Sequence, residues 1–221
     1  MTQKKIILVH GIGDATPGWT KAINAAELLE VSPERIEEFV YEDILEKNWF
    51  HQMTVTAAKL YLQYQFGSLA ANLANQGQDY IDDVLAYFFV PGVRNKILDR
   101  LAQVLNRYPN ALLVGYSLGS VICYEGLKNR LTSDHKVTFI SLGSPLSKRV
   151  VRQFLKVPDK SRPQVSNWFN FYGTLDPVSG GIKHLGCYPE DQFKITAGHQ
   201  FSRYLLAVKN FLKVFGQSEK R

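Results

Sequence analysis

Residues 111–120 read Ala-Leu-Leu-Val-Gly-Tyr-Ser-Leu-Gly-Ser, and this stretch decides the fold. Its apolar start is typical of a strand buried on both faces, and the residues from 120 to about 131 have the pattern of a helix. A GxSxG pentapeptide, Gly115 to Gly119, therefore falls at a strand-to-helix turn. Such a sharp turn strains the serine backbone, and flanking glycines remove side chains that would clash. The pattern predicts that Ser117 is a nucleophile, exposed at the carboxyl end of a sheet.

Similar β-rich runs recur along the chain and alternate with helical patterns. The predicted strands are 4–9, 36–41, 111–115, 137–142, 168–172 and 193–196. The predicted helices are 20–30, 93–108, 120–131, 146–156 and 200–215, beside a long helical stretch from about 45 to 89. This alternation implies right-handed crossovers and a mostly parallel sheet with helices on both faces. The predicted fold class is α/β, with about six strands.

The length of 221 residues and the hydrophobic content of 45% fit a single domain that spans 1–221. Within it, the segment 49–89 is unusual. It is helix-like and rich in aromatic residues such as Tyr61, Tyr64 and Phe66, which makes it too apolar for a linker. It is either a helical lid over an apolar pocket or an extra pair of helices packed on the sheet. The sequence leaves both interpretations open.

The first predicted strand is followed directly by His-Gly-Ile-Gly at 10–13. Acyl transfer needs two backbone N–H groups facing the carbonyl oxygen, because one donor stabilises a tetrahedral oxyanion poorly. The N–H groups of Ile12 and Leu118 are the candidates for this pair. A phosphate-binding glycine loop is the alternative, but the third glycine of GxGxxG is missing. His10 is predicted to orient this loop rather than to carry protons.

A serine hydroxyl needs a base, and the base needs a carboxylate that fixes its tautomer. His199 and Asp176 each follow a predicted strand, so they fall at the same sheet edge as Ser117. The chain order Ser, Asp, His also fits this type of site. The alternatives are a surface or capping role for the histidine and a turn role for the aspartate, which precedes a proline. His184 is then the second candidate base, and Asp191 the second candidate acid.

Taken together, VHGIGD, GYSLGS, GTLDPV and GHQF resemble the α/β-hydrolase superfamily, in particular its lipase-like and esterase-like serine hydrolases. The resemblance runs from residue 6 to about 215. It implies a catalytic triad of Ser117, Asp176 and His199, with Ile12 and Leu118 in the oxyanion hole. Residues 141–146 are similar to the GSP loop that borders the site in some members. The antiparallel strands that usually precede the His-Gly strand have no counterpart, so a small version of the fold is expected.

The formal charge is +6, but the basic residues are spread along the chain without the aromatic interleaving that nucleic-acid binding favours. We therefore expect no nucleic-acid partner. Lys148, Arg152 and Lys156 are spaced by four and are predicted to share one helix face. This face is either simply solvated or a contact for a membrane surface or an acidic partner.

Cys123 and Cys187 are far apart in sequence and belong to no metal or redox motif. No metal ligand cluster is visible, and we expect no cofactor. The opening residues do not have the pattern of a signal peptide, and no run of eighteen apolar residues occurs. The expected location is cytoplasmic.

The expected function is hydrolysis of a carboxylic ester, with an apolar or lipid acyl group, through an acyl-enzyme intermediate. The same triad serves thioesters and amides, which are alternative substrates. A catalytically silent protein of this fold that binds a lipid or a protein partner is the alternative from another class. The sequence does not indicate the oligomeric state.

Overall fold

The computed structural model describes residues 4–12, 15–45, 56, 78–131, 134–159 and 161–218. Its sheet has six strands: β1 (Ile6–Val9), β2 (Ile36–Phe39), β3 (Leu112–Tyr116), β4 (Thr138–Leu142), β5 (Asn167–Gly173) and β6 (Asp191–Ile195). Their order is β2-β1-β3-β4-β5-β6, and every neighbouring pair is parallel. The six predicted strands and the parallel sheet are confirmed.

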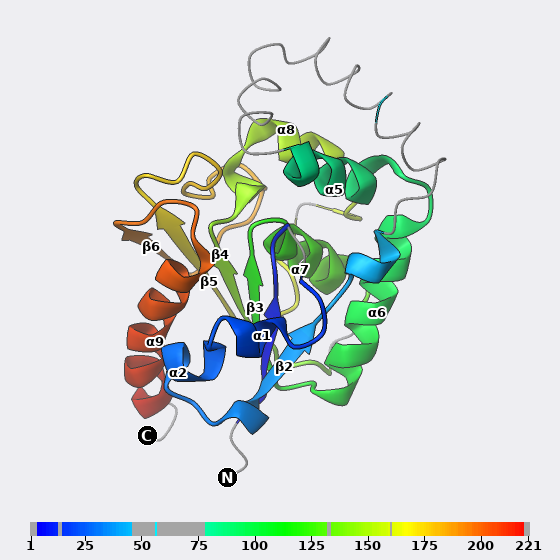
Figure 1. The fold of residues 1–221 in the computed structure, drawn as a ribbon. Coiled ribbons are helices and arrows are strands. Elements are labelled where there is room, and N and C mark those ends of the chain that lie inside the picture. The colour runs from blue at the N-terminus through cyan, green and yellow to red at the C-terminus, as the bar shows by residue number, and fades with distance from the viewer. Residues whose placement is uncertain are drawn as a thin grey trace.

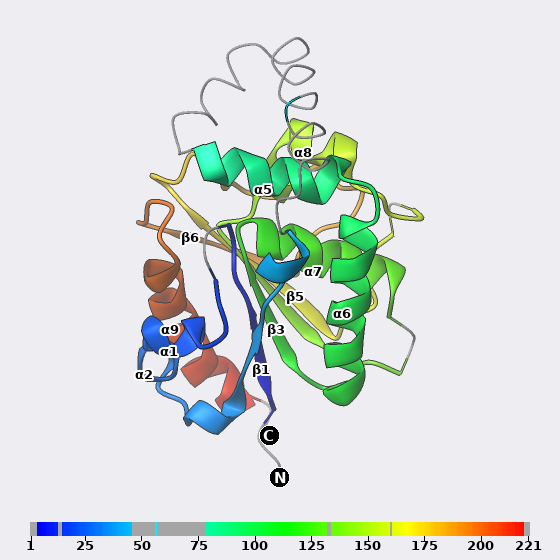
Figure 2. The ribbon, with the colours of Figure 1, turned by 45° about the vertical axis from the view of Figure 1, so that its right-hand side comes forward.

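Helices cover both faces of this sheet (Figure 1). On one face lie α1 (Trp19–Ala22), α2 (Ala25–Leu29) and α9 (Phe201–Ser218); on the other lie α6 (Val93–Arg107) and α7 (Leu118–Asn129) (Figure 2). Successive side chains of a strand point to opposite faces. Ile6 and Leu8 therefore pack in the core under α9, while Ile7 and Val9 pack in the core under α6 and α7. Burial on both sides explains why the strand sequence is continuously apolar.

The predicted helix 20–30 is wrong in one respect, because the chain forms two short helices there. Helix α1 ends at Ala22, and Asn24, which precedes α2, has a left-handed backbone with φ 53°. Asparagine adopts this conformation more readily than most residues, since its short polar side chain bonds locally. The break turns the chain so that α2 packs against α9, where Glu30 pairs with Lys209 and Lys213.

The predicted helix 146–156 is also shorter than expected. A 3₁₀ turn, η3 (Pro145–Ser147), is followed by α8 (Arg149–Phe154). Lys148 precedes α8 with an extended backbone, and Lys156 lies beyond its end. Arg152 turns back to the carbonyl oxygen of Ser147. The predicted basic helix face of Lys148, Arg152 and Lys156 is therefore not formed.

Most of the segment 49–89, predicted to be either a lid or an extra pair of helices, lies outside the described residues. Its described end is α5 (Gln78–Phe89), which lies beside α8 beyond the carboxyl ends of β3 and β4 in both views (Figures 1 and 2). The ring of Phe154 in α8 contacts Phe89 and Phe88 of α5, with ring centroids 4.9 and 5.8 Å apart. Helices α5 and α8 thus form a layer over the sheet edge that holds Ser117.

A buried ionic cluster joins this layer to α7. The carboxylate of Glu125 accepts hydrogen bonds from the Tyr87 hydroxyl at 2.6 Å, the Arg94 guanidinium at 3.2 Å and the backbone N–H of Lys156. Arg94 also donates to the carbonyl oxygens of Phe88 and Phe154. Burial raises the pKa of Glu125, although the Arg94 charge and the hydrogen bonds oppose this. The cluster fixes α5, α6 and α8 on the helix that follows the nucleophile.

Candidate active site

The turn between β3 and α7 places Ser117 where the sequence predicts. Its backbone has φ 50° and ψ −123°, a region that costs energy for a residue with a side chain. The Ser117 N–H donates to the carbonyl oxygen of Leu142 at 2.9 Å, which fixes the turn on the end of β4. A Cβ at Gly119 would lie 2.1 Å from the His10 oxygen, and one at Gly115 would lie 2.8 Å from the Cys123 sulfur. No side chain therefore fits at either flanking position, and both must be glycine.

One sequence expectation about Ser117 is wrong: the residue is only 1% exposed. Its neighbours explain the difference, because Gly11 lies so close that a Cβ there would be 2.8 Å from the Ser117 Cβ. His199 covers another side, with Nε2 3.0 Å from the Ser117 Oγ. The nucleophile candidate is thus enclosed by the residues around it rather than standing free at the sheet edge.

The structure brings the three predicted triad residues together. Asp176 follows β5 and His199 precedes α9, so both lie at the carboxyl edge of the sheet. The His199 ring spans the gap, with Nδ1 2.8 Å from Oδ2 of Asp176 and Nε2 3.0 Å from the Ser117 hydroxyl. His184 is exposed, and Asp191 begins β6 at the opposite, amino-terminal edge. Neither alternative residue is part of this chain of contacts.

The Asp176 side chain is buried and has four hydrogen-bond donors. Oδ1 accepts from the N–H groups of Val178 at 2.8 Å and Ser179 at 3.2 Å. Oδ2 accepts from His199 and from the Tyr204 hydroxyl at 2.5 Å. Burial alone would raise the pKa of this carboxyl group, but the bonds to His199 and Tyr204 outweigh it and hold the pKa below its ordinary value. Asp176 is therefore an anion that can fix the His199 tautomer.

Sequence reasoning missed two aromatic residues of this site. Tyr204, in the first turns of α9, donates to Asp176. Tyr116, the variable residue before Ser117 in the pentapeptide, stacks on the His199 ring with centroids 4.9 Å apart and on Phe201 at 4.8 Å. The position of Tyr116 next to the nucleophile was a usable signal. Nothing in the amphipathic pattern of α9 marks Tyr204 as different from a core residue.

The His-Gly loop after β1 lies against the serine turn. Leu118 is the first residue of α7, so its N–H has no acceptor within the helix. His10 is buried, stacks on Tyr41 with centroids 4.2 Å apart, and has Nδ1 2.7 Å from the Gly11 oxygen. Burial lowers the pKa of His10 to about 4, although the bond to Gly11 opposes this, so the ring is neutral. These contacts are those of a residue that orients the loop. Gly13 lies outside the described residues.

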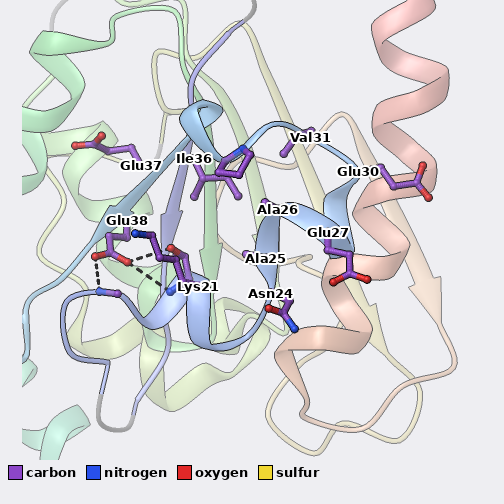
Figure 3. Close-up of a pocket in the computed structure, with 13 residues that line it drawn as sticks. Lys21, Asn24, Ala25, Ala26, Glu27, Glu30, Val31, Ile36, Glu37 and Glu38 are labelled. Atoms are coloured by element: carbon purple, nitrogen blue, oxygen red, sulfur yellow. Dashed lines mark hydrogen bonds between the residues drawn. The ribbon is translucent and has the colours of Figure 1, made fainter.

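A cavity of about 1020 Å³ lies elsewhere, between β2 and helices α1 and α2 (Figure 3). Two of the carboxylates that line it already have partners. Glu38 accepts from the Gly18 N–H at 2.6 Å and the Thr20 hydroxyl at 3.0 Å, and Glu30 pairs with two lysines of α9. No triad residue lines this groove. The candidate site therefore remains at the carboxyl edge of the sheet.

Two further observations concern the described part of the chain only. It contains no group of three or more His, Cys, Asp or Glu side chains arranged to hold a metal ion. None of its helices combines the length and the apolar character that crossing a membrane requires.

The comparisons with known proteins bear on the fold. A solved structure from Xanthomonas campestris pv. campestris, described provisionally as a hydrolase of the alpha/beta superfamily, is similar to this chain. The TM-score is 0.50 and the identity 16%, over 99% of each chain. No family model and no curated protein matches. At this identity the likeness concerns the fold alone. With the parallel sheet and the serine turn, it shows that the chain has the α/β-hydrolase fold, as predicted.

Proposed function

We propose that this protein is a serine hydrolase that cleaves carboxylic esters. Ser117 is the nucleophile, His199 is the base, and Asp176 is the carboxylate that orients the base. The observation that carries the proposal is the continuous hydrogen-bond chain from the Ser117 hydroxyl through His199 to Asp176. A strained serine turn at a sheet edge supports it, because such strain persists where the surrounding structure imposes it and is common at active sites.

In the proposed reaction, Ser117 Oγ attacks the ester carbonyl carbon and its proton passes to Nε2 of His199. The oxyanion accepts hydrogen bonds from the N–H groups of Ile12 and Leu118. The intermediate collapses to an acyl-serine, and His199 returns the proton to the departing alcohol. Water, activated by His199, then releases the carboxylic acid. Asp176 keeps the proton of the neutral ring on Nδ1, so that Nε2 can accept one.

An apolar acyl group is the proposed specificity. Leu175, directly before Asp176, exposes 72% of its surface and so places an aliphatic side chain next to a triad residue. The ring of Tyr116 stacks on His199, and the ring of Phe201 stacks on Tyr116. The layer of α5 and α8 adds phenylalanine rings beyond the same sheet edge. These side chains favour an aliphatic substituent near the scissile bond over a charged one.

The test is labelling with a fluorophosphonate probe, which reacts with activated serines. Wild type, Ser117→Ala and Ser147→Ala are compared, with mass spectrometry to locate the adduct. Ser147 is the matched control because its buried hydroxyl lies outside the triad. We expect labelling of wild type and Ser147→Ala at Ser117, none of Ser117→Ala, and ester turnover that rises with acyl length. Folded wild-type protein that neither labels nor hydrolyses esters would overturn the proposal and favour a silent lipid- or protein-binding role.

A further inference from the structure

The carbonyl group of Gly11 is held by two side-chain donors. Tyr41, which follows β2 and is fully buried, places its hydroxyl within hydrogen-bond distance of the Gly11 oxygen and 3.2 Å from the His10 oxygen. Nδ1 of His10 lies 2.7 Å from the same Gly11 oxygen. A loop carbonyl with two dedicated side-chain donors is fixed in direction far more firmly than one that faces solvent.

This carbonyl shares a peptide group with the N–H of Ile12. Because a trans peptide is planar, its C=O and N–H bonds point in opposite directions. Fixing the Gly11 oxygen toward Tyr41 therefore fixes the Ile12 N–H away from Tyr41. Gly11 itself touches the serine turn, since a Cβ there would lie 2.8 Å from that of Ser117. The anchored peptide thus lies next to the nucleophile.

We propose that the Tyr41 hydroxyl is a positioning group for the oxyanion hole, which directs the Ile12 N–H by holding the other end of its peptide group. The proposal rests on the proposed function, because Ile12 needs a direction only if an oxyanion forms at Ser117. Tyr41 touches no reacting atom and acts through the Gly11–Ile12 peptide.

The hydroxyl and the ring of Tyr41 have separable roles. The ring packs in the core and stacks on His10, and a phenylalanine would keep both contacts. Only the hydroxyl reaches the carbonyl oxygens. Without it, the Gly11 oxygen keeps a single donor from a neutral imidazole, and the peptide can rotate. The substitution Tyr41→Phe therefore removes the positioning bond while leaving the packing in place.

The test compares wild type, Tyr41→Phe and the matched control Tyr124→Phe on a p-nitrophenyl ester and the corresponding thionoester. Tyr124 is also buried, but its hydroxyl only approaches the Cys187 sulfur at 3.6 Å. Sulfur is larger than oxygen and a weaker hydrogen-bond acceptor, so a well-directed oxyanion hole favours the ester strongly. We expect Tyr41→Phe to lower kcat on the ester about tenfold with little change in KM, less than the ~10²–10³ lost when a donor is deleted.

The deciding readout is the ratio of kcat/KM for ester over thionoester, because a smaller active fraction or a looser fold lowers both rates and leaves the ratio unchanged. A ratio that falls severalfold in Tyr41→Phe, and not in Tyr124→Phe, supports the positioning role. A ratio equal to that of wild type overturns it, even if kcat falls. If fluorophosphonate labels no serine in wild type and no ester is hydrolysed, the proposed function fails first, and the positioning role fails with it.

Discussion

The two sides of Ser117 are held by similar residues that act on different groups. On the base side, a buried tyrosine, Tyr204, donates to the Asp176 carboxylate, which carries a charge. On the oxyanion side, a buried tyrosine, Tyr41, donates to the Gly11 carbonyl, which is neutral. The difference predicts different responses to substitution. Changes on the base side act on a charged group, so their effects depend on pH, whereas changes on the oxyanion side act on a neutral peptide group and are expected to lower the rate without changing the shape of the pH profile.

The largest effect is expected from Asp176→Asn. An asparagine presents its NH₂ group to Nδ1 of His199, so the ring proton moves to Nε2, which can then no longer accept the serine proton. We expect kcat at neutral pH to fall by about 10⁴-fold, as the wrong tautomer does in this type of triad. Steady-state kinetics measures it, with Asp191→Asn as the control. A loss of less than tenfold, or a similar loss in the control, would show that Asp176 is not the acid.

The second-largest loss of kcat is expected from Gly11→Ala, on the oxyanion side. The backbone of Gly11 is not left-handed, so alanine is excluded only by space: its Cβ would meet the Ser117 Cβ at 2.8 Å and the Tyr116 ring at 3.0 Å. The loop must move away from the serine, and the Ile12 N–H moves with it. We expect kcat to fall about 10²–10³-fold, comparable to loss of one oxyanion donor.

The pH profile of kcat for Gly11→Ala tests whether the oxyanion side acts independently of the base side. The profile should keep its wild-type shape, because no titrating group on the base side is changed. Gly181→Ala is the control, since a Cβ there would make only ordinary contacts, 3.7 Å or more away. A profile displaced along the pH axis would show that the two sides of Ser117 are not independent.

The sequence was informative where a local pattern encodes the structure. The alternating strands and helices, the strand-to-helix turn at Ser117 and the loop positions of Asp176 and His199 follow from runs of a few residues and were predicted correctly. The break at Asn24 was missed because a helical pattern does not reveal one left-handed residue. Tyr41 and Tyr204 were missed for a different reason: each occupies an ordinary core position, and its hydroxyl acquires a role only from a partner distant in sequence.

The smallest effect on turnover is expected from Tyr204→Phe, whose effect on stability depends on pH. Asp176 keeps its bonds from His199, Val178 and Ser179, and the Gly173 N–H keeps the Ser179 hydroxyl as acceptor. We therefore expect kcat to fall only a few-fold. The loss of a donor to a charged group should lower the free energy of unfolding at pH 7 by about 1–3 kcal/mol. Tyr124→Phe, with a weakly bonded hydroxyl, is the control.

The sign of this pH dependence follows from the Asp176 carboxyl. Its pKa is lower in the folded protein than in the unfolded chain, so it contributes stability above its ordinary pKa of 3.8 and loses that contribution as pH falls through the folded value. Tyr204→Phe raises the folded pKa of Asp176 and reduces the contribution. The difference from wild type in urea unfolding should thus be full at pH 7 and shrink below about pH 4. A difference that is equal at pH 7 and pH 3 would mean that the Tyr204 hydroxyl stabilises the fold through its bonds to the Gly173 N–H and the Ser179 hydroxyl, and not through the charge of Asp176.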